Sequence, residues 1–423
     1  MGAGNKEVPT GRDGNPPLDA PSPNPVVHPG LRQATGAPPP DRLVELDGLR
    51  GFAMLLVLGF HLNHMAPGDG ILSDFVCGAA RLGFVGIDIF FALSGLLITG
   101  ILLRTREAGG YFRTFYARRS LRIFPLYFVA CGLFLHAVYL VPGDGDYNYF
   151  WLRDREISPL WYWCYLTNVK IVMDGDFHHM LMAVSWSLSI EEQFYLVWPA
   201  VVRWLSPRAL VRLCAGLIVG ALVLRFWLVF NGTSGKVVHV LTLVRVDALA
   251  AGSLLAVAVR DGTTWRILRR AARIVLPVAV VGTVAISCVH WTGDAHSKST
   301  EFLYNDYVQS FGSVLVLMAS TSLLVRLIGP PATSRMARFF RNRWLCRVGC
   351  YSYCIYLTHV PIIIAVREVA FVRWFPGPLP LLPQLAYYVV GTAASVAVAA
   401  ASWRWVERPI LRIKDRFKYW PSP

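Results

Sequence analysis

Long apolar stretches recur along the chain from residue 51 to residue 403, and they are long enough to cross a bilayer as helices. A bilayer interior offers an exposed backbone no hydrogen-bonding partner, so only helices and closed barrels cross it. The alternating strand pattern that is typical of membrane barrels is absent from the sequence. Apolar residues make up 55% of the chain. The sequence therefore predicts an all-α, polytopic membrane protein.

The apolar stretches predict ten spans, at about 51–66, 84–103, 123–141, 186–202, 213–230, 238–259, 274–291, 307–325, 348–366 and 381–403. Cytoplasmic loops are rich in Lys and Arg, and this rule orients the chain. With both termini in the cytoplasm, the inner segments carry 31 Lys and Arg and the outer segments carry 8. The aromatic segment 159–172 is too short to cross comfortably and is predicted to be interfacial or re-entrant in an outer loop. We expect a multi-pass protein of the inner (cytoplasmic) membrane.

Three regions follow from composition. Residues 1–42 are rich in Pro and Gly and predict a disordered cytoplasmic tail, residues 43–412 predict the membrane domain, and residues 413–423 predict a basic cytoplasmic tail. The net charge of +15 is typical of cytoplasmic loops beside membrane lipids, and no nucleic-acid-binding motif accompanies it. The eight cysteines form no metal-binding pattern, so no metal site is expected.

Ionisable residues inside the predicted spans are functional candidates, because burying a charged side chain in lipid costs free energy unless the side chain has a partner or is hydrated. At about 1.5 Å per residue, a group of them lies roughly 16–24 Å from the inner surface of the membrane. The members of this group are His61, Asp88, Glu192, Asp247 and His359. Imidazoles and carboxylates at one depth indicate acid–base chemistry. Salt bridges that join helices, such as Arg245 with a carboxylate, are the structural alternative.

A second group of charges lies near the predicted cytoplasmic face. Arg119 and Arg122 are three residues apart, so they share a helical face at the cytoplasmic end of their span. Guanidinium groups near the positive end of a helix dipole bind phosphate well. Arg50 adds a third guanidinium at a similar depth, eleven residues before His61. The alternative is ordinary positive-inside charge that contacts lipid head groups.

The same residues carry a family resemblance. Seven motifs occur in the order seen in acyltransferase-3 membrane proteins: LDGLRGFAMLLVLGFH (46–61), GIDIFFALSGLLI (86–98), RRSLRIFPLY (118–127), SWSLSIEEQFYLVWP (185–199), RVDALAAG (245–252), SYCIYLTHVP (352–361) and WVERP (405–409). One departure is Thr358, where many members of the family have Trp before the histidine. The chain resembles the family from about residue 43 to residue 412.

The resemblance implies an acyl-CoA-dependent O-acyltransferase. Proteins of this family move acyl groups, usually short ones, onto hydroxyls of sugars, glycolipids, cell-wall polymers or secondary metabolites. Acetyl-CoA or another short acyl-CoA would then be a co-substrate, with no permanently bound cofactor. The acceptor would be a hydroxyl-bearing sugar, a glycoconjugate or a glycosylated metabolite such as a macrolide. A proton-coupled transporter or exporter, which also uses intramembrane His and carboxylates, is the alternative function.

The resemblance also implies roles for individual residues. The arginine-x10-histidine element of the family matches Arg50 and His61, and its Arg-x-x-Arg element matches Arg119 and Arg122. The family's glutamate falls on Glu191 or Glu192. We expect the arginines to hold the CoA phosphates and His61 to act as general base, with Glu192 or Asp88 fixing its tautomer. Direct transfer and an acyl-histidine intermediate both fit. Substrate-binding or supporting roles are expected for Trp186, Tyr195, Arg245, Asp247 and His359.

Overall fold

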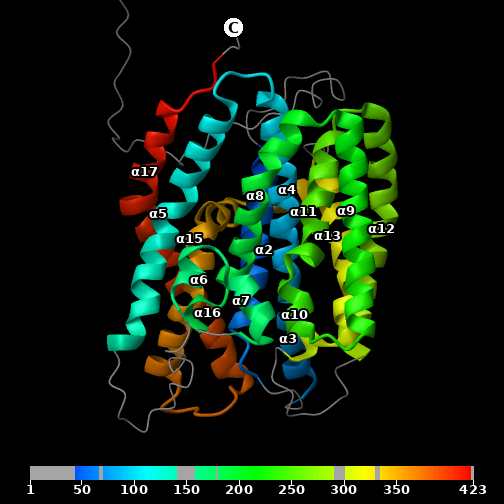
Figure 1. Cartoon of the computed structure of the whole chain (residues 1–423). Helices are drawn as coiled ribbons and strands as arrows, with labels where there is room; N and C mark the ends of the chain where they lie inside the picture. Colours follow the sequence, from blue (N-terminus) through cyan, green and yellow to red (C-terminus); the bar gives the residue numbers. More distant parts are fainter. Residues whose placement is uncertain are drawn as a thin grey trace, which may run out of the picture.

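The apolar stretches fold into long helices that run side by side, as the computed structural model shows (Figure 1). The structure describes residues 43–65, 70–140, 158–177, 180–289, 301–328 and 334–420. Within these ranges the regular elements are helical, and a single isolated bridge joins Gly109 to Trp420. The prediction of an all-α protein is confirmed for the described chain. The predicted tail at 1–42 lies outside the described residues.

Ten described helices have 15 residues or more, and one of them lies at each predicted span. They are α2 (Val44–His61), α4 (Val85–Thr105), α5 (Tyr111–Leu140), α8 (Ser185–Trp204), α9 (Pro207–Phe230), α11 (Thr242–Ala258), α12 (Gly262–Val289), α13 (Ser313–Leu327), α15 (Arg343–Val366) and α16 (Leu381–Ser402). In Figure 1, α5 lies near one edge of the bundle and α12 at the other, with α2, α4 and α8 between them. Shorter helices lie between them or, in the case of α17, after the last of them: α3 (Ile71–Arg81), α6 (Leu160–Trp163), α7 (Thr167–Asp174), α10 (Gly235–Val240), α14 (Arg335–Phe340) and α17 (Arg408–Ile413).

Seven helical segments of the described chain are long and apolar enough to cross a membrane. The long helices outside this set are α2, α5 and α8. Two of these three hold intramembrane candidates from the sequence, namely His61 on α2 and the adjacent Glu191 and Glu192 on α8. Ionisable side chains lower the hydropathy of a span that lines a site. A multi-pass protein is therefore supported, while ten crossings and cytoplasmic termini stay predictions.

The aromatic segment 159–172 does not form a spanning helix. It folds into α6 and α7, which have 4 and 8 residues and are separated by a turn in which Tyr165 has a φ of 55°. Eight helical residues extend only about 12 Å, against a hydrocarbon core of about 30 Å. The prediction that this segment does not cross as a single helix is confirmed.

Two helix pairs approach so closely that only glycine fits at the contact. On α2, a Cβ at Gly51 would lie 1.9 Å from the backbone oxygen of Leu345 on α15. In return, a Cβ at Gly349 on α15 would lie 1.9 Å from the backbone oxygen of Asp47 on α2. Small residues allow this close packing between helices in lipid, where van der Waals contact contributes strongly to association.

The second close pair is α4 with α11. A Cβ at Gly95 would lie 2.0 Å from the Leu249 backbone oxygen, and a Cβ at Gly252 would lie 2.0 Å from the Ala92 backbone oxygen. The contact is therefore reciprocal, as it is between α2 and α15. Because α2 also packs against α4, the two close pairs form a continuous central unit.

The segment after α17 folds back over the start of α5. The Arg118 side chain donates to the Phe417 carbonyl at 2.7 Å, and the Thr114 hydroxyl donates to the Lys418 carbonyl at 3.2 Å. The Trp420 indole lies directly over Gly109, where a Cβ would approach it to 2.2 Å. This C-terminal segment thereby holds the helix end that precedes the Arg119 and Arg122 pair.

We expect Gly51→Ala to destabilise the protein, because the added methyl group would overlap a backbone oxygen that cannot move without separating α2 from α15. Overpacking of this kind costs about 1–3 kcal/mol or more. Gly59→Ala is the matched control on the same helix, since a Cβ there meets no atom within 4 Å. Thermal unfolding of both variants in detergent measures the difference. Equal midpoints for the two variants would contradict the close contact.

Candidate active site

Two cavities lie in the described helices and share part of their lining. The arginine cavity, of about 100 Å³, is lined by Arg50, Arg119, Arg122, Glu191, Ser94 and their apolar neighbours. The histidine cavity, of about 450 Å³, is lined by His61, His239, Trp186, Tyr304 and a largely apolar surround. Two residues line both cavities, Ile87 from α4 and Tyr356 from α15.

The arginine cavity brings together the three arginines that the sequence grouped. Arg50 comes from α2, and Arg119 and Arg122 come from adjacent turns of α5. Arg50 also lies 3.6 Å from the Asp47 carboxylate, an i,i+3 ion pair on α2. Three guanidinium groups around one small cavity form a cationic surface that suits an anion with several phosphate oxygens.

One glutamate of the adjacent pair enters this cavity. Glu191 lines it and accepts hydrogen bonds from the Ser94 hydroxyl at 2.6 Å and from the Tyr195 hydroxyl at 3.1 Å. The Arg119 guanidinium lies over the Tyr195 ring, 4.0 Å from its centroid. Glu192 is not among the residues that line either cavity, and its Oε1 atom is buried without a hydrogen-bond partner. The geometry therefore joins Glu191, Tyr195 and Arg119 into one polar group.

His61 faces the histidine cavity with a defined tautomer. Its Nδ1 atom lies 2.9 Å from the Val57 carbonyl oxygen one turn earlier on α2. A carbonyl oxygen only accepts, so Nδ1 carries the proton and Nε2 keeps its lone pair. The backbone holds this tautomer, where the sequence analysis expected a carboxylate to hold it. An imidazole with a free Nε2 lone pair in a cavity is competent as a general base.

His359 lies against His61 from the neighbouring helix. The two ring centroids are 4.8 Å apart and the planes are nearly perpendicular, at 78°. The His359 Nδ1 atom lies 2.8 Å from the Tyr356 carbonyl and 3.1 Å from the Ile355 carbonyl, so it also carries the proton. Its Nε2 atom is buried without a hydrogen-bond partner. His359 thus packs against the His61 ring and is not among the lining residues of either cavity.

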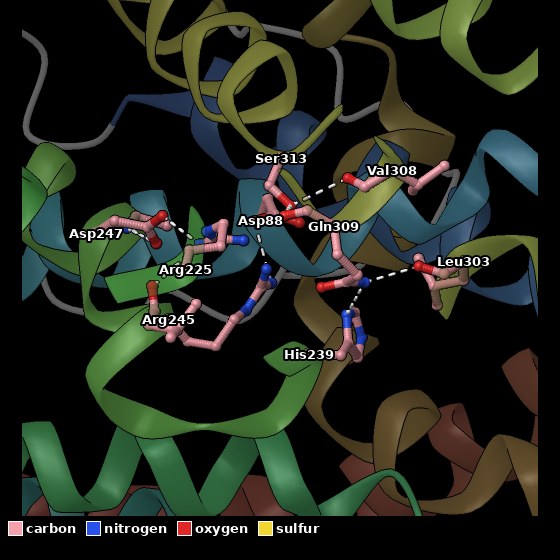
Figure 2. Close-up of polar contacts among 11 residues, drawn as sticks. Asp88, Arg225, His239, Arg245, Asp247, Leu303, Val308, Gln309 and Ser313 are labelled. Carbon is pink, nitrogen blue, oxygen red and sulfur yellow. Dashed lines mark hydrogen bonds and ion pairs between the residues drawn. The ribbon is translucent and has the colours of Figure 1, made fainter. Parts of the chain in front are cut away.

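The remaining charges of the predicted group form two buried ion pairs. Figure 2 shows Asp88 facing Arg245, with 3.0 Å between the oxygen and nitrogen atoms, and Asp247 facing Arg225, with 2.5 Å between them. Asp88 therefore neutralises Arg245 rather than holding His61. The Arg225 amino group also donates to the Val244 carbonyl at 3.0 Å. These pairs join α4 to α11 and α9 to α11, which is the role that the structural alternative gave to Arg245.

The Asp88–Arg245 pair borders the histidine cavity through an aromatic residue. The Arg245 guanidinium lies 5.9 Å from the Trp186 ring centroid and 5.2 Å from that of Phe91. Trp186 lines the cavity, and its ring centroid is 4.9 Å from that of His239. Trp186, predicted from the sequence as a supporting residue, therefore lies between an ion pair and a cavity imidazole.

His239 is a cavity residue that the sequence analysis missed. Its Nδ1 atom lies 3.3 Å from the amide nitrogen of Gln309, which also donates to the Leu303 carbonyl at 2.7 Å (Figure 2). Because that carbonyl fixes the orientation of the amide, Nδ1 accepts and Nε2 carries the proton. The cavity is thus lined by one imidazole with a free Nε2 lone pair, on His61, and one with an Nε2–H donor, on His239. In the sequence, His239 lies at the edge of a span and offers no spacing signal.

The histidine cavity also has an exposed, charged part of its lining. Lys236 on α10 and Asp176 after α7 form an ion pair at 2.6 Å, and both line the cavity. Phe177 and Tyr304 lie beside them, with ring centroids 6.0 Å apart. A polar pair among aromatic rings suits a ligand that presents both hydroxyls and apolar ring faces.

We expect Asp247→Ala to destabilise the protein strongly, because it would leave the Arg225 guanidinium buried and unpaired. Breaking a buried pair from one side costs about 3–5 kcal/mol in soluble proteins. The double variant Arg225→Met with Asp247→Leu should recover most of the loss, since an apolar pair of similar volume needs no counter-charge. Thermal unfolding in detergent measures both variants. A double variant as unstable as the single one would contradict a purely structural role for this pair.

Comparison with known proteins adds a family match to this geometry. Residues 43–404 match the family model described as an acyltransferase domain, Acyl_transf_3. The chain is 29% identical over 381 residues to the peptidoglycan O-acetyltransferase OatA of Listeria monocytogenes. This alignment covers 86% of this chain and 55% of that protein. It is 28% identical to the putative peptidoglycan O-acetyltransferase YrhL of Bacillus subtilis, over 86% of this chain and 54% of that protein. It is 26% identical to the O-acetyltransferase OatA of Staphylococcus aureus, over 88% of this chain and 57% of that protein.

The chain therefore spans little more than half the length of these curated relatives. No solved structure matches it. The matched region contains every residue that lines the two cavities.

Proposed function

Because the chain belongs to the acyltransferase-3 family, we propose that it is a membrane O-acyltransferase that moves a short acyl group from acyl-CoA to a hydroxyl of a sugar or glycosylated acceptor. The observation that carries this proposal is the pair of adjoining cavities. One cavity presents three guanidinium groups, and the other presents an imidazole with a free lone pair. Acyl transfer from CoA needs both an anion-binding site and a general base.

The arginine cavity is the donor site in this proposal. CoA carries several phosphate groups at the end remote from its thioester, and Arg50, Arg119 and Arg122 would hold them. Glu191 orients Tyr195 beneath the Arg119 guanidinium and so fixes the position of that cation. We assign this positioning role to Glu191. The sequence analysis expected Glu192 or Asp88 to fix the His61 tautomer, and the Val57 carbonyl takes that role in this proposal.

The histidine cavity is the acceptor site. His61 Nε2 takes the proton of the acceptor hydroxyl as its oxygen attacks the thioester carbonyl. The new C–O bond forms, the C–S bond breaks, and the proton passes from His61 to the departing CoA thiolate. Aromatic rings and the Asp176–Lys236 pair in this cavity match the mixed surface of a sugar. The names of the relatives, which are peptidoglycan O-acetyltransferases, favour a sugar acceptor.

A proton-coupled transporter is the second candidate, because two adjoining cavities that share two lining residues also suit alternating access. Against it, Asp88 is occupied by Arg245, which removes one carboxylate from the expected proton path. The decisive experiment uses purified protein in nanodiscs. Thermal stabilisation by CoA, together with labelled acetyl transfer from acetyl-CoA to an oligosaccharide, supports the acyltransferase. If CoA does not stabilise the protein and no acetyl group is transferred, the acyltransferase proposal is contradicted.

We expect His61→Ala to reduce transfer at least about 100-fold, because a general base contributes about 10²–10⁴-fold. Binding of CoA should be unchanged, since His61 does not line the arginine cavity. His136→Ala is the control, because His136 makes the same type of Nδ1 contact with a backbone carbonyl but lies exposed on α5. Activity of His61→Ala above a tenth of the wild type would remove the base role from this residue.

We expect Arg119→Ala and Arg122→Ala each to raise the KM for acyl-CoA about tenfold or more, with the acceptor KM nearly unchanged. Each substitution removes a charge-assisted contact to phosphate that lies far from the reacting carbonyl. Arg113→Ala is the matched control, since Arg113 is an exposed arginine at the start of the same helix. Steady-state kinetics with both substrates varied, supported by direct CoA binding, measures the effect. Unchanged CoA affinity in both variants would return these arginines to ordinary cytoplasmic charge.

A further inference from the structure

The two cavities meet at a wall of two side chains. Ile87 on α4 and Tyr356 on α15 line both cavities, and no other residue of the described chain lines both. The three arginines lie on one side of this wall and His61 lies on the other. An acyl group that is delivered from the arginine side must therefore meet Ile87 and Tyr356 before it reaches the base.

Hydrogen bonds hold the Tyr356 side chain in place, one with Ser187 on α8 and one with Val184, which immediately precedes α8. Its hydroxyl donates to the Val184 carbonyl at 3.0 Å and lies 2.6 Å from the Ser187 hydroxyl. Either hydroxyl can donate in the contact between Ser187 and Tyr356, and the Ser187 hydroxyl also lies 3.4 Å from the Val184 carbonyl oxygen. Val184 lines the histidine cavity and Ser187 lines the arginine cavity. The phenol is thus tied to residues on both sides of the wall.

Tyr356 is also tied to the position of the base. It lies one helical turn before His359, and the two ring centroids are 5.8 Å apart. The Tyr356 carbonyl receives the His359 Nδ1 proton at 2.8 Å, and the His359 ring packs on His61. A shift of Tyr356 therefore disturbs the support of His61, whereas a change at Ile87 leaves these contacts in place.

We propose that Ile87 and Tyr356 form a selective wall that sets the length of the acyl group and keeps water in the histidine cavity away from the thioester. This inference rests on the proposed function and adds the specificity-determining residues. Ile87 limits the space for the acyl chain, and the anchored Tyr356 keeps the passage closed until an acyl group occupies it. Both residues act by positioning and exclusion, and His61 does the proton transfer.

Two separate predictions follow from this wall, one about the length of the acyl group and one about hydrolysis of the thioester. A shorter side chain at position 87 leaves room for a longer acyl group at the point where the chain passes. A loosened Tyr356 admits water, which then attacks the thioester carbonyl in place of the acceptor hydroxyl. In that case the C–O bond forms to water, the C–S bond breaks, and the free acid and CoA are released.

The first experiment compares acetyl-CoA and butyryl-CoA as donors for Ile87→Ala and for the wild type in nanodiscs. We expect the ratio of kcat/KM for butyryl-CoA to that for acetyl-CoA to rise about tenfold or more, since single methylene groups in an apolar pocket discriminate about 10–200-fold. Ile87→Val is the second variant in case Ile87→Ala folds poorly, and it should give a smaller rise in the same direction. An unchanged ratio in a folded variant would overturn the length-setting role.

The second experiment measures acyl-CoA hydrolysis against transfer for Tyr356→Phe, which keeps the ring and loses both hydrogen bonds. We expect the ratio of hydrolysis to transfer to rise several-fold, and to rise less in Ser187→Ala, where the bond to Val184 persists. Tyr387→Phe is the matched control, because it also loses a buried phenol bond, to the Ile363 carbonyl at 2.7 Å, but lines neither cavity. A loss of stability alone would move Tyr356→Phe and Tyr387→Phe together.

The outcomes separate the wall from the proposed function. Wild-type protein that binds CoA and transfers acetyl groups, combined with unchanged ratios in the Ile87 and Tyr356 variants, overturns the wall and leaves the acyltransferase intact. Wild-type protein that neither binds CoA nor transfers acetyl groups overturns both.

Discussion

The close backbone contacts of α2 with α15 and of α4 with α11 place the proposed base and the Asp88–Arg245 pair. Reciprocal glycines bring each pair into contact at the backbone, and two pairs of side chains follow. His61 on α2 reaches His359 on α15, and Asp88 on α4 reaches Arg245 on α11. With larger residues at these crossings the helices would lie further apart, which would separate the two imidazole rings and open the buried Asp88–Arg245 pair.

The buried carboxylates, the His61 imidazole and the guanidinium groups of the arginine cavity are each accommodated by different surroundings. Asp88 and Asp247 are neutralised by arginines, whereas His61 gives its proton to a backbone carbonyl and keeps its lone pair free. The guanidinium groups of Arg119 and Arg122 face a cavity in which a counter-ion can bind. The first solution strengthens helix packing and the other two leave capacity for chemistry. The proposed function therefore gives structural and catalytic roles to different charges among residues that looked alike in the sequence.

The sequence predicted the helices and the arginine cluster because both depend on local spacing. Apolar runs define helices, and the three-residue spacing of Arg119 and Arg122 places both on one face. The partners of Asp88 and His61 depend on helix crossings, which no local pattern encodes, so the carboxylate expected beside His61 is replaced by Val57 of the same helix. The choice of Glu191 over Glu192 and the exposure of His239 to a cavity depend on helix rotation by the same argument.

The arrangement of the two cavities explains why one helix carries both Arg50 and His61. Eleven residues of helix separate them by roughly 16 Å along the axis, so they reach different cavities while they remain rigidly connected. In the proposed reaction, a donor held at the arginine end presents only its acyl terminus at the wall of Ile87 and Tyr356. On this proposal the phosphates stay among cations, the acceptor stays among aromatic rings, and only the small apolar group enters the space between. An arrangement of this kind joins an anionic donor to a sugar hydroxyl without burying either one in the path of the other.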